Sequence, residues 1–253
     1  AAALDLARLG ASLVLTGRNE NAGAAIADRI RKERGARAEF IQADISSLAE
    51  VRTLAARISA GHPKLDVLVN NAGARIDRYQ ASADGIELTF ATNHLGHFLL
   101  TGLLLENLER SGAGRVVTVA SVAHRGVSGE KIEWVMPADR YNRRQAYARS
   151  KLANILFAFE LARRLRERPV MSNAVDPGII ATRFARNNGL LAWGRHVVAH
   201  LIKGELVSAA AAADSVVYPT TAEAEAKTTG KLFRGRQIVE PSDHAQDRAL
   251  AGD

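Results

Sequence analysis

Cysteine is absent from the 253 residues of the sequence, which excludes a disulfide framework and a thiolate metal site. A chain without disulfides fits a reducing compartment, and we expect a cytoplasmic protein. Long apolar runs are missing too. The run at 98–105 is far shorter than the roughly 20 residues that cross a bilayer, so no membrane span is predicted.

The charge balance is positive, with 34 Lys and Arg residues against 27 Asp and Glu residues, a net charge of +7. This excess permits an anionic partner such as a nucleotide. Aromatic residues make up only 5% of the chain, and no stacking surface or nucleic-acid motif accompanies the charge. We therefore predict no nucleic-acid partner and interpret the arginine cluster at 162–168 as the solvated end of a helix.

Short β-branched runs alternate with longer helical patterns along the whole chain. The interiors of the short runs are nearly all apolar, which is typical of parallel strands covered on both faces by helices. We therefore expect an α/β fold, a single doubly wound Rossmann-type domain over 1–253 with a mostly parallel sheet. The expected strands are 12–18, 38–44, 65–73, 115–121 and 170–178. The expected helices are 21–35, 47–59, 86–110 and 147–167.

Small and polar residues follow each predicted strand. In doubly wound sheets, ligands bind beyond the carboxyl ends of the strands, and glycine there lets a ligand approach the backbone. An extended ligand across this edge would account for all of these strand ends. They are Thr16-Gly17-Arg18, Asp44, Asn70-Asn71-Ala72-Gly73, Ser121 and Asp176-Pro177-Gly178.

Tyr147 and Lys151 stand one helical turn apart in the last predicted helix. A free phenol has a pKa near 10, too high for efficient proton exchange at neutral pH. With an effective dielectric of about 20 and a separation of about 6 Å, the lysine charge would stabilise the phenolate by roughly 2.8 kcal/mol. We therefore expect a pKa of about 8 for Tyr147. The alternative is an ordinary pair on a helix surface.

Four motifs in order and spacing resemble the short-chain dehydrogenase/reductase family. They are NNAG after a strand, a serine closing the next strand, YARSK, and PGIIAT after the following strand. Further stretches resemble its retinol-dehydrogenase-like branch. These are TNHLGHFLL at 92–100, VASVAHRG at 119–126, SKLANILFAFELARRL at 150–165 and TGKLF at 229–233.

The resemblance implies a catalytic set of four residues. Tyr147 would exchange the proton with the substrate oxygen, Ser121 would hydrogen-bond that oxygen, and Lys151 would also hold the nicotinamide ribose. Asn93 would order a water that continues the proton path. Two alternatives stay open: Ser121 as a strand terminator and Asn93 as a polar residue in a kinked helix.

NADP(H) is the favoured cofactor. Arg18 occupies the position at which members of the family recognise the adenosine ribose, and an arginine there can pair with the 2′-phosphate of NADP. The alternative is a solvated arginine paired with Glu20. By resemblance, Asp44 and Ile45 border the adenine, although Asp44 could instead serve as an acid before the helix at 47–59. The further residues implied are Asn71, Ala72 and Gly73 at the adenosine ribose and Pro177, Gly178, Ile180 and Thr182 at the nicotinamide amide and pyrophosphate.

One departure from the family pattern concerns the start of the chain. Family members begin with a strand and a glycine-rich turn whose amides meet the pyrophosphate. The sequence instead begins in what resembles the helix after that turn. We expect the missing strand to belong between the strands at 12–18 and 65–70. The 253 residues alone are then expected to bind cofactor weakly or not at all, and a non-catalytic binding or scaffold role is the alternative function.

The expected reaction is NADP-dependent hydride transfer between nicotinamide and a lipophilic alcohol, aldehyde or ketone. An apolar segment at 187–204, which includes Trp193, falls where the family has a lid over the substrate. His94 and His97 are three residues apart, but no third ligand is in register, so no metal site is expected. Pairing through the helices ending near 110 and 167 would give a homodimer, by resemblance.

Overall fold

The structure of the chain is a computed structural model that describes residues 1–127, 132–180, 206–222 and 227–251. Thr182, Trp193 and the predicted lid at 187–204 lie outside the described residues.

The central sheet is parallel apart from its last strand. Its order is β3 (Val67–Asn70), β4 (Gly114–Val119), β5 (Val170–Asp176), β8 (Leu232–Arg234) and β9 (Gln237–Ile238), with β9 antiparallel. Nearly every residue of β4 and β5 is buried, as expected for strands covered on both faces. Two short strands form a separate parallel pair, β6 (Ile179–Ile180) and β7 (Leu206–Val207).

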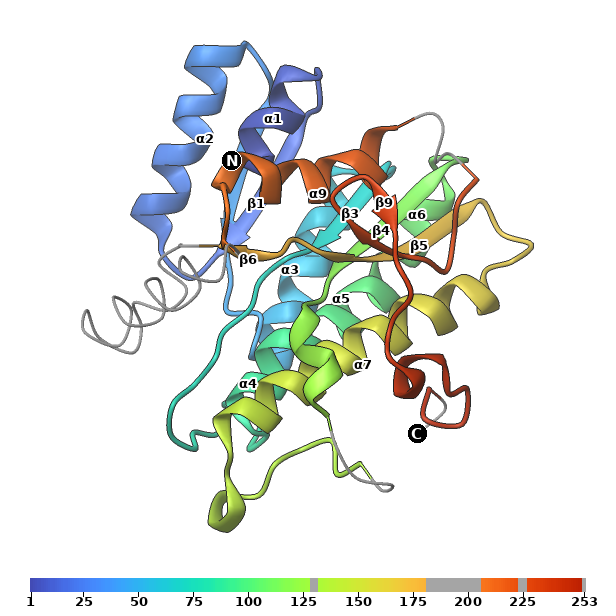
Figure 1. Cartoon of the computed structure of the whole chain (residues 1–253). Coiled ribbons are helices and arrows are strands. Elements are labelled where there is room, and N and C mark those ends of the chain that lie inside the picture. The colour runs from blue at the N-terminus through green and yellow to red at the C-terminus, as the bar shows by residue number, and fades with distance from the viewer. Residues whose placement is uncertain (128–131, 181–205, 223–226, 252–253) are drawn as a thin grey trace.

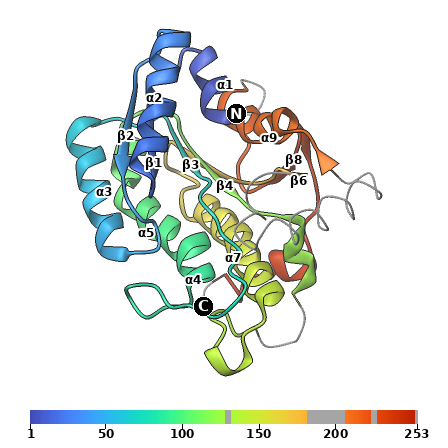
Figure 2. The same ribbon diagram turned by 90° about the vertical axis from the view of Figure 1, so that its left-hand side faces the viewer.

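Helices cover both faces of the sheet (Figures 1 and 2). One layer consists of α1 (Ala2–Arg8), α2 (Glu20–Arg34) and α9 (Ala209–Thr221). The other consists chiefly of α3 (Leu48–Gly61), α5 (Gly96–Leu103) and α7 (Arg143–Arg164). Within the layers, α1 contacts α9, and α3 contacts α5. The expected doubly wound α/β architecture is confirmed.

The helix expected at 86–110 is not continuous. It consists of α4 (Leu88–Phe90), a π-helical turn (Ala91–Leu95), α5 and α6 (Leu105–Glu109). Glu87 caps its start, because its carboxylate accepts from the amides of Thr89 at 2.7 Å and Phe90 at 2.9 Å. The π turn matters for the site because it contains Asn93, and such turns re-aim side chains within a helix.

A break divides the sheet between β1 and β3. Strand β1 (Leu13–Gly17) pairs with β2 (Ala38–Gln42) in a two-stranded parallel sheet of its own. Among the described residues, no strand pairing joins β1 to β3. The break therefore lies at the position where the sequence pattern predicts an absent strand.

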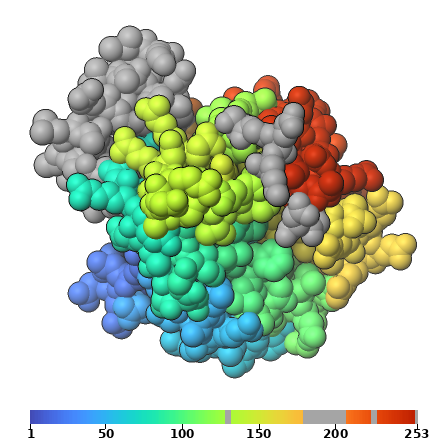
Figure 3. Space-filling model, turned by 90° about the horizontal axis from the view of Figure 1, so that it is seen from below, coloured from blue at the N-terminus to red at the C-terminus, as the bar shows by residue number. Residues whose placement is uncertain are grey.

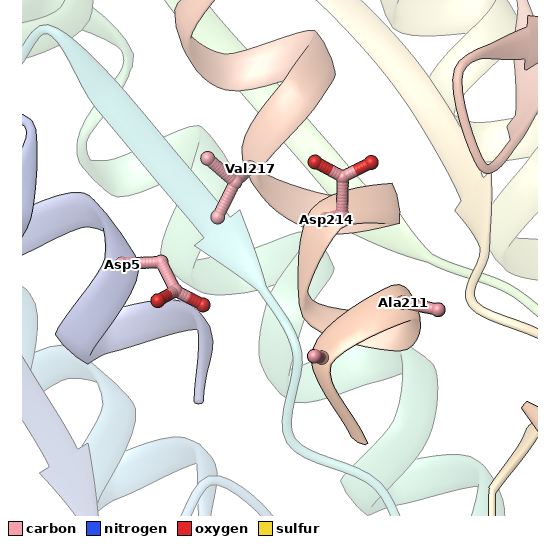
Figure 4. Close-up of a pocket in the computed structure, with 5 residues that line it drawn as sticks. Asp5, Ala211, Asp214 and Val217 are labelled. Carbon is pink, nitrogen blue, oxygen red and sulfur yellow. The ribbon is translucent and has the colours of Figure 1, made fainter. Parts of the chain in front are cut away.

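A cleft of about 420 Å³ lies between α1 and α9 (Figure 4). Its two acidic side chains are already paired, Asp5 with Arg8 at 2.7 Å and Asp214 with Arg236 at 2.8 Å. None of the predicted site residues lines this cleft. Within the described part of the chain, no helix is long and apolar enough to cross a bilayer.

Candidate active site

Tyr147 and Lys151 lie in the first half of α7. The helix begins four residues earlier than the sequence predicted, because Asn142 acts as its N-cap and accepts from the amides of Arg144 at 3.0 Å and Gln145 at 3.2 Å. This start places both residues inside regular helix. Their spacing of four therefore puts them on one face.

Lys151 is buried against the end of β4. The residue is only 3% exposed, and Nζ donates to the carbonyl oxygen of Val119 at 2.8 Å. Nζ also lies 5.8 Å from the centre of the Tyr147 ring. Burial lowers the pKa of Lys151 to about 8, and the negative charge of Asp176 opposes this shift. The surface-pair alternative for Tyr147 and Lys151 does not fit a buried lysine.

Ser121 follows β4 by two residues and caps a short 3-10 helix, Val122–Gly126. Its hydroxyl also makes a hydrogen bond with the side chain of Tyr147. Ser121, Tyr147 and Lys151 are therefore gathered at the carboxyl end of one strand, where the doubly wound fold places its ligands. A role of Ser121 as a strand terminator alone would not account for its hydrogen bond with Tyr147.

The expected pKa of about 8 for Tyr147 is wrong for the ligand-free protein. Burial raises the pKa of Tyr147 to about 12, while the hydrogen bond from Ser121 and the charge of Arg75 act in the opposite direction. The sequence-based expectation treated the phenol as solvated, whereas packing in the fold removes water from it. Lys151 also donates from Nζ to the backbone carbonyl of Val119.

Asn93 is fully buried in the π turn and holds the segment that follows β3. Its Oδ1 accepts from the Ala74 amide at 2.7 Å, and its Nδ2 donates to the Ala74 carbonyl at 2.9 Å and to Ser150 Oγ at 2.9 Å. Both Nδ2 hydrogens of Asn93 therefore already have acceptors in the protein. A water held by Asn93 would have to donate its own hydrogen to the side-chain or main-chain oxygen of Asn93.

A buried amide and a buried hydroxyl near the site were not predicted from the sequence. Asn154 donates to the Val119 carbonyl at 3.0 Å, beside Lys151. Ser150 donates to the Tyr147 carbonyl at 2.8 Å and accepts from Asn93. Ser150 and Asn154 follow Tyr147 by three and seven residues in the same helix. This helical spacing places them on the face of Tyr147 and was the sequence signal that could have identified them.

His97 and His124 are buried, and His94 is half-buried. His124 Nδ1 donates to the Ser121 carbonyl at 2.7 Å, and its Nε2 accepts from the Ser242 amide at 3.1 Å. Burial lowers the pKa of His94 to about 4 and that of His97 to about 3. His97 Nδ1 donates to the Asn93 carbonyl at 3.1 Å, and His94 Nδ1 bonds to Asn154 Oδ1 at 3.1 Å. Both rings therefore have protein partners.

The predicted adenosine side lies at the ends of β1 and β2. Arg18 is exposed after β1, and the described residues include no ion pair between its side chain and Glu20. Asp44 accepts from the Ser46 amide at 2.9 Å and hydroxyl at 2.7 Å, while Ser47 is the N-cap of α3. Ile45 is 9% exposed, and its carbonyl oxygen packs against Gly96 of α5.

Asn71, Ala72 and Gly73 are exposed after β3, so their backbone is open to a ligand. A Cβ at Gly73 would lie 3.6 Å from Lys151 Nζ and 3.4 Å from Asn93 Oδ1. Pro177 and Gly178 follow β5, and Gly178 has a φ of +78°, which favours glycine. Ile180 ends β6.

Asp176 forms a pair that sequence reasoning did not find. It is 1% exposed, accepts from Arg234 at 2.7 Å and from the Gly178 amide at 3.1 Å. The pair joins the ends of β5 and β8, which are 58 residues apart in sequence. It also fixes the turn that carries Pro177 and Gly178.

Comparison with known proteins agrees with this geometry. The family model for short chain dehydrogenases matches residues 1–190. Human retinol dehydrogenase 13 is 34% identical over 98% of this chain and 76% of its own length. Mouse polyprenol dehydrogenase is 38% identical over 98% of this chain and 75% of its own length.

Among solved structures, the active-site complex of RhlG from Pseudomonas aeruginosa with NADP is 27% identical, with a TM-score of 0.73. The alignment covers 92% of this chain and 88% of that one. Family model, relatives and fold thus lead to the same result as the motifs. The chain belongs to the short-chain dehydrogenase/reductase family, is retinol-dehydrogenase-like, and is an oxidoreductase.

Proposed function

We propose that the protein transfers hydride between NADP(H) and a lipophilic alcohol, aldehyde or ketone, with Tyr147 exchanging the proton. The observation that carries this proposal is the hydrogen bond between Ser121 and Tyr147 directly beside the buried amine of Lys151. A phenol held by a hydroxyl donor at a strand end has the geometry of a general acid.

The residues present fit a dinucleotide. The exposed backbone at Asn71–Gly73 has no side chain at Gly73 to fill the space beside Lys151 Nζ. Lys151 donates one hydrogen bond to Val119, and an ammonium has three donors, so others are available for ribose hydroxyls. The bound cofactor would supply the hydride.

In the ligand-free protein the Tyr147 phenol, with its pKa raised to about 12, keeps its proton at neutral pH. Donation of this proton to a carbonyl oxygen would therefore need the resulting tyrosinate to be stabilised. Ser121 would donate a hydrogen bond to the same oxygen. The tyrosinate left behind would be stabilised by the positive charges of Lys151 and Arg75.

Two features support the finer assignments. The exposed Arg18 has no ion-pair partner among the described residues, which leaves its guanidinium available for a 2′-phosphate, and RhlG was solved with NADP. Retinol and polyprenol dehydrogenases are named for long apolar alcohols, which favours a lipophilic substrate here.

A panel of aliphatic and aromatic aldehydes and ketones, assayed on the natural gene product with NADPH and with NADH, tests the proposal. We expect turnover with NADPH that rises with the length of the apolar chain, loss of turnover in Tyr147→Phe, and full turnover in the control Tyr79→Phe. Nucleotide titration separates the alternative of a non-catalytic scaffold. NADPH binding without turnover of any carbonyl would contradict the proposed reaction.

Assembly and compartment stay predictions. The homodimer is tested by sedimentation of the purified protein, and the cytoplasmic location by microscopy of the tagged natural gene product.

A further inference from the structure

The four residues after Gly73 are held in place by three side chains, one from the π turn and two from residues at or just before the start of α7. Asn93 holds the amide and carbonyl of Ala74, and Tyr141 donates its hydroxyl hydrogen to the carbonyl of Ile76 at 2.8 Å. Arg143 pairs with Asp77 at 2.6 Å. Figure 3 shows the two segments side by side, with the segment near 80 in teal and that near 140 in yellow-green.

Arg75 lies between these fixed points in the sequence. No hydrogen bond or ion pair of its guanidinium occurs among the residues that the structure describes, and its Nε is buried without a partner. The charge of Arg75 nevertheless acts on the Tyr147 phenol and lowers its pKa. Arg75 follows Gly73 by two residues, and a Cβ at Gly73 would lie 3.6 Å from Lys151 Nζ, so Arg75 lies close to the catalytic end of the site. A buried, unpaired donor is costly unless a ligand satisfies it.

Three acidic side chains in the described part of the chain that could be considered as counter-ions for Arg75 already have other partners. Asp77 pairs with Arg143, and Asp176 pairs with Arg234. The carboxylate of Glu87 accepts from two amides at the start of α4. The site thus contains a guanidinium with no protein counter-ion among the described residues. Its planar fork matches a carboxylate, which it can bind through two parallel hydrogen bonds.

We propose that Arg75 is a specificity-determining residue that binds a carboxylate carried by the substrate, so that the preferred substrates are lipophilic oxo acids or the matching hydroxy acids. This inference rests on the proposed function and narrows its substrate class. A free carboxylate at a distance from the reacting carbonyl would pair with Arg75 while the carbonyl oxygen meets Ser121 and Tyr147.

The test compares aldehydes that carry a carboxylate or a methyl group at the same ring position, the para- and meta-carboxybenzaldehydes and the corresponding methylbenzaldehydes. The variants are Arg75→Met, Arg75→Lys and a control, Arg78→Met, an exposed arginine three residues further along the same segment. We expect Arg75→Met to lower kcat/KM about 10- to 100-fold for a carboxylated aldehyde and less than about threefold for its methyl partner. Arg75→Lys should keep part of the preference, and Arg78→Met all of it.

Three results would overturn the inference. An unchanged ratio between carboxylated and methylated aldehydes in Arg75→Met would do so while the proposed function stands. A change in the KM for NADPH instead of the aldehyde would assign Arg75 to a cofactor phosphate. Calorimetric titration with benzoate needs no turnover, and equal or absent binding in wild type and Arg75→Met would also overturn it. If neither aldehyde is reduced by wild type but benzoate binding depends on Arg75, the proposed reaction fails and the carboxylate site remains.

Discussion

Lys151 donates from Nζ to the carbonyl oxygen of Val119 at 2.8 Å, and Asn154 donates to the same oxygen at 3.0 Å. Val119 is the last residue of β4, two positions before Ser121. One turn of α7 is thereby attached to the strand end that carries the serine. The lysine therefore helps to place Ser121 and Tyr147 relative to each other, in addition to any contact it makes with a cofactor.

The ionisation of Tyr147 is predicted to occur far above neutral pH in the ligand-free protein. Burial raises its pKa to about 12, so Tyr147 should contribute no tyrosinate absorbance below about pH 10. The measurement is the difference between the tyrosinate titrations of wild type and Tyr147→Phe. A difference step near about pH 8 would restore the sequence-based expectation that Lys151 alone sets this pKa.

Arg18 is predicted to set the preference for NADPH over NADH. Its exposed guanidinium has no ion pair in the described part of the chain, so Arg18→Gln should remove an attraction to the 2′-phosphate and change little else. We expect the ratio of kcat/KM values for the two cofactors to fall about tenfold or more. Arg57→Gln, at an exposed position on α3, serves as the control. Equal ratios in wild type and Arg18→Gln would refute this assignment.

The lowered pKa values of His94 in the π turn and His97 in α5 predict a loss of stability in mild acid. The pKa of His94 falls from 6.5 to about 4 and that of His97 from 6.5 to about 3 on folding. The unfolded chain therefore binds protons first as the pH drops below 6.5, and the free energy of unfolding falls with it. The expected slope is about 1.4 kcal/mol per pH unit for each histidine.

Urea denaturation between about pH 7 and pH 4.5 measures this slope. His97→Asn should reduce it whatever its effect on stability at neutral pH, whereas the partly exposed His62→Asn should leave the contribution of His94 and His97 intact. A slope that does not change in His97→Asn would contradict a buried neutral imidazole at this position.

Gly96 is predicted to be essential for packing, and Gly102 on the same helix is not. A Cβ at Gly96 would lie 2.0 Å from the carbonyl oxygen of Ile45, so the backbone would have to move. We expect Gly96→Ala to lower the free energy of unfolding by about 2 to 3 kcal/mol. A Cβ at Gly102 would meet no atom within 4 Å, so Gly102→Ala should be neutral or stabilise α5 by up to about 1 kcal/mol.

The motifs at the strand ends could be predicted from sequence because they are local. Apolar strands, the Tyr147–Lys151 spacing and the glycine after Asn71-Ala72 each reflect a backbone requirement within a few residues. The π turn at Ala91–Leu95 was not predicted, because the apolar spacing of 86–110 also fits one uninterrupted helix. Glu87 as a buried cap gives the only local sign of where that helix begins.

Features that depend on long-range packing could not be predicted from the sequence. The pair between Asp176 and Arg234 joins residues 58 positions apart, and neither residue indicates the other. The pKa of Tyr147 depends on how much water the fold removes, which periodicity does not report. Arg75 is one of many dispersed arginines in the sequence, and nothing in the sequence indicates that its Nε is buried without a hydrogen-bond partner in the described part of the chain.

The most direct test of the central claim is the fate of a labelled hydride in wild type and Tyr147→Phe. With NADPH deuterated at the transferable position of nicotinamide and a reducible aldehyde, the account predicts deuterium on the carbinol carbon of the wild-type product. It predicts a rate about 100- to 10,000-fold lower in Tyr147→Phe, with NADPH binding retained. Deuterium transfer at the wild-type rate in Tyr147→Phe would contradict the claim that this phenol carries the proton.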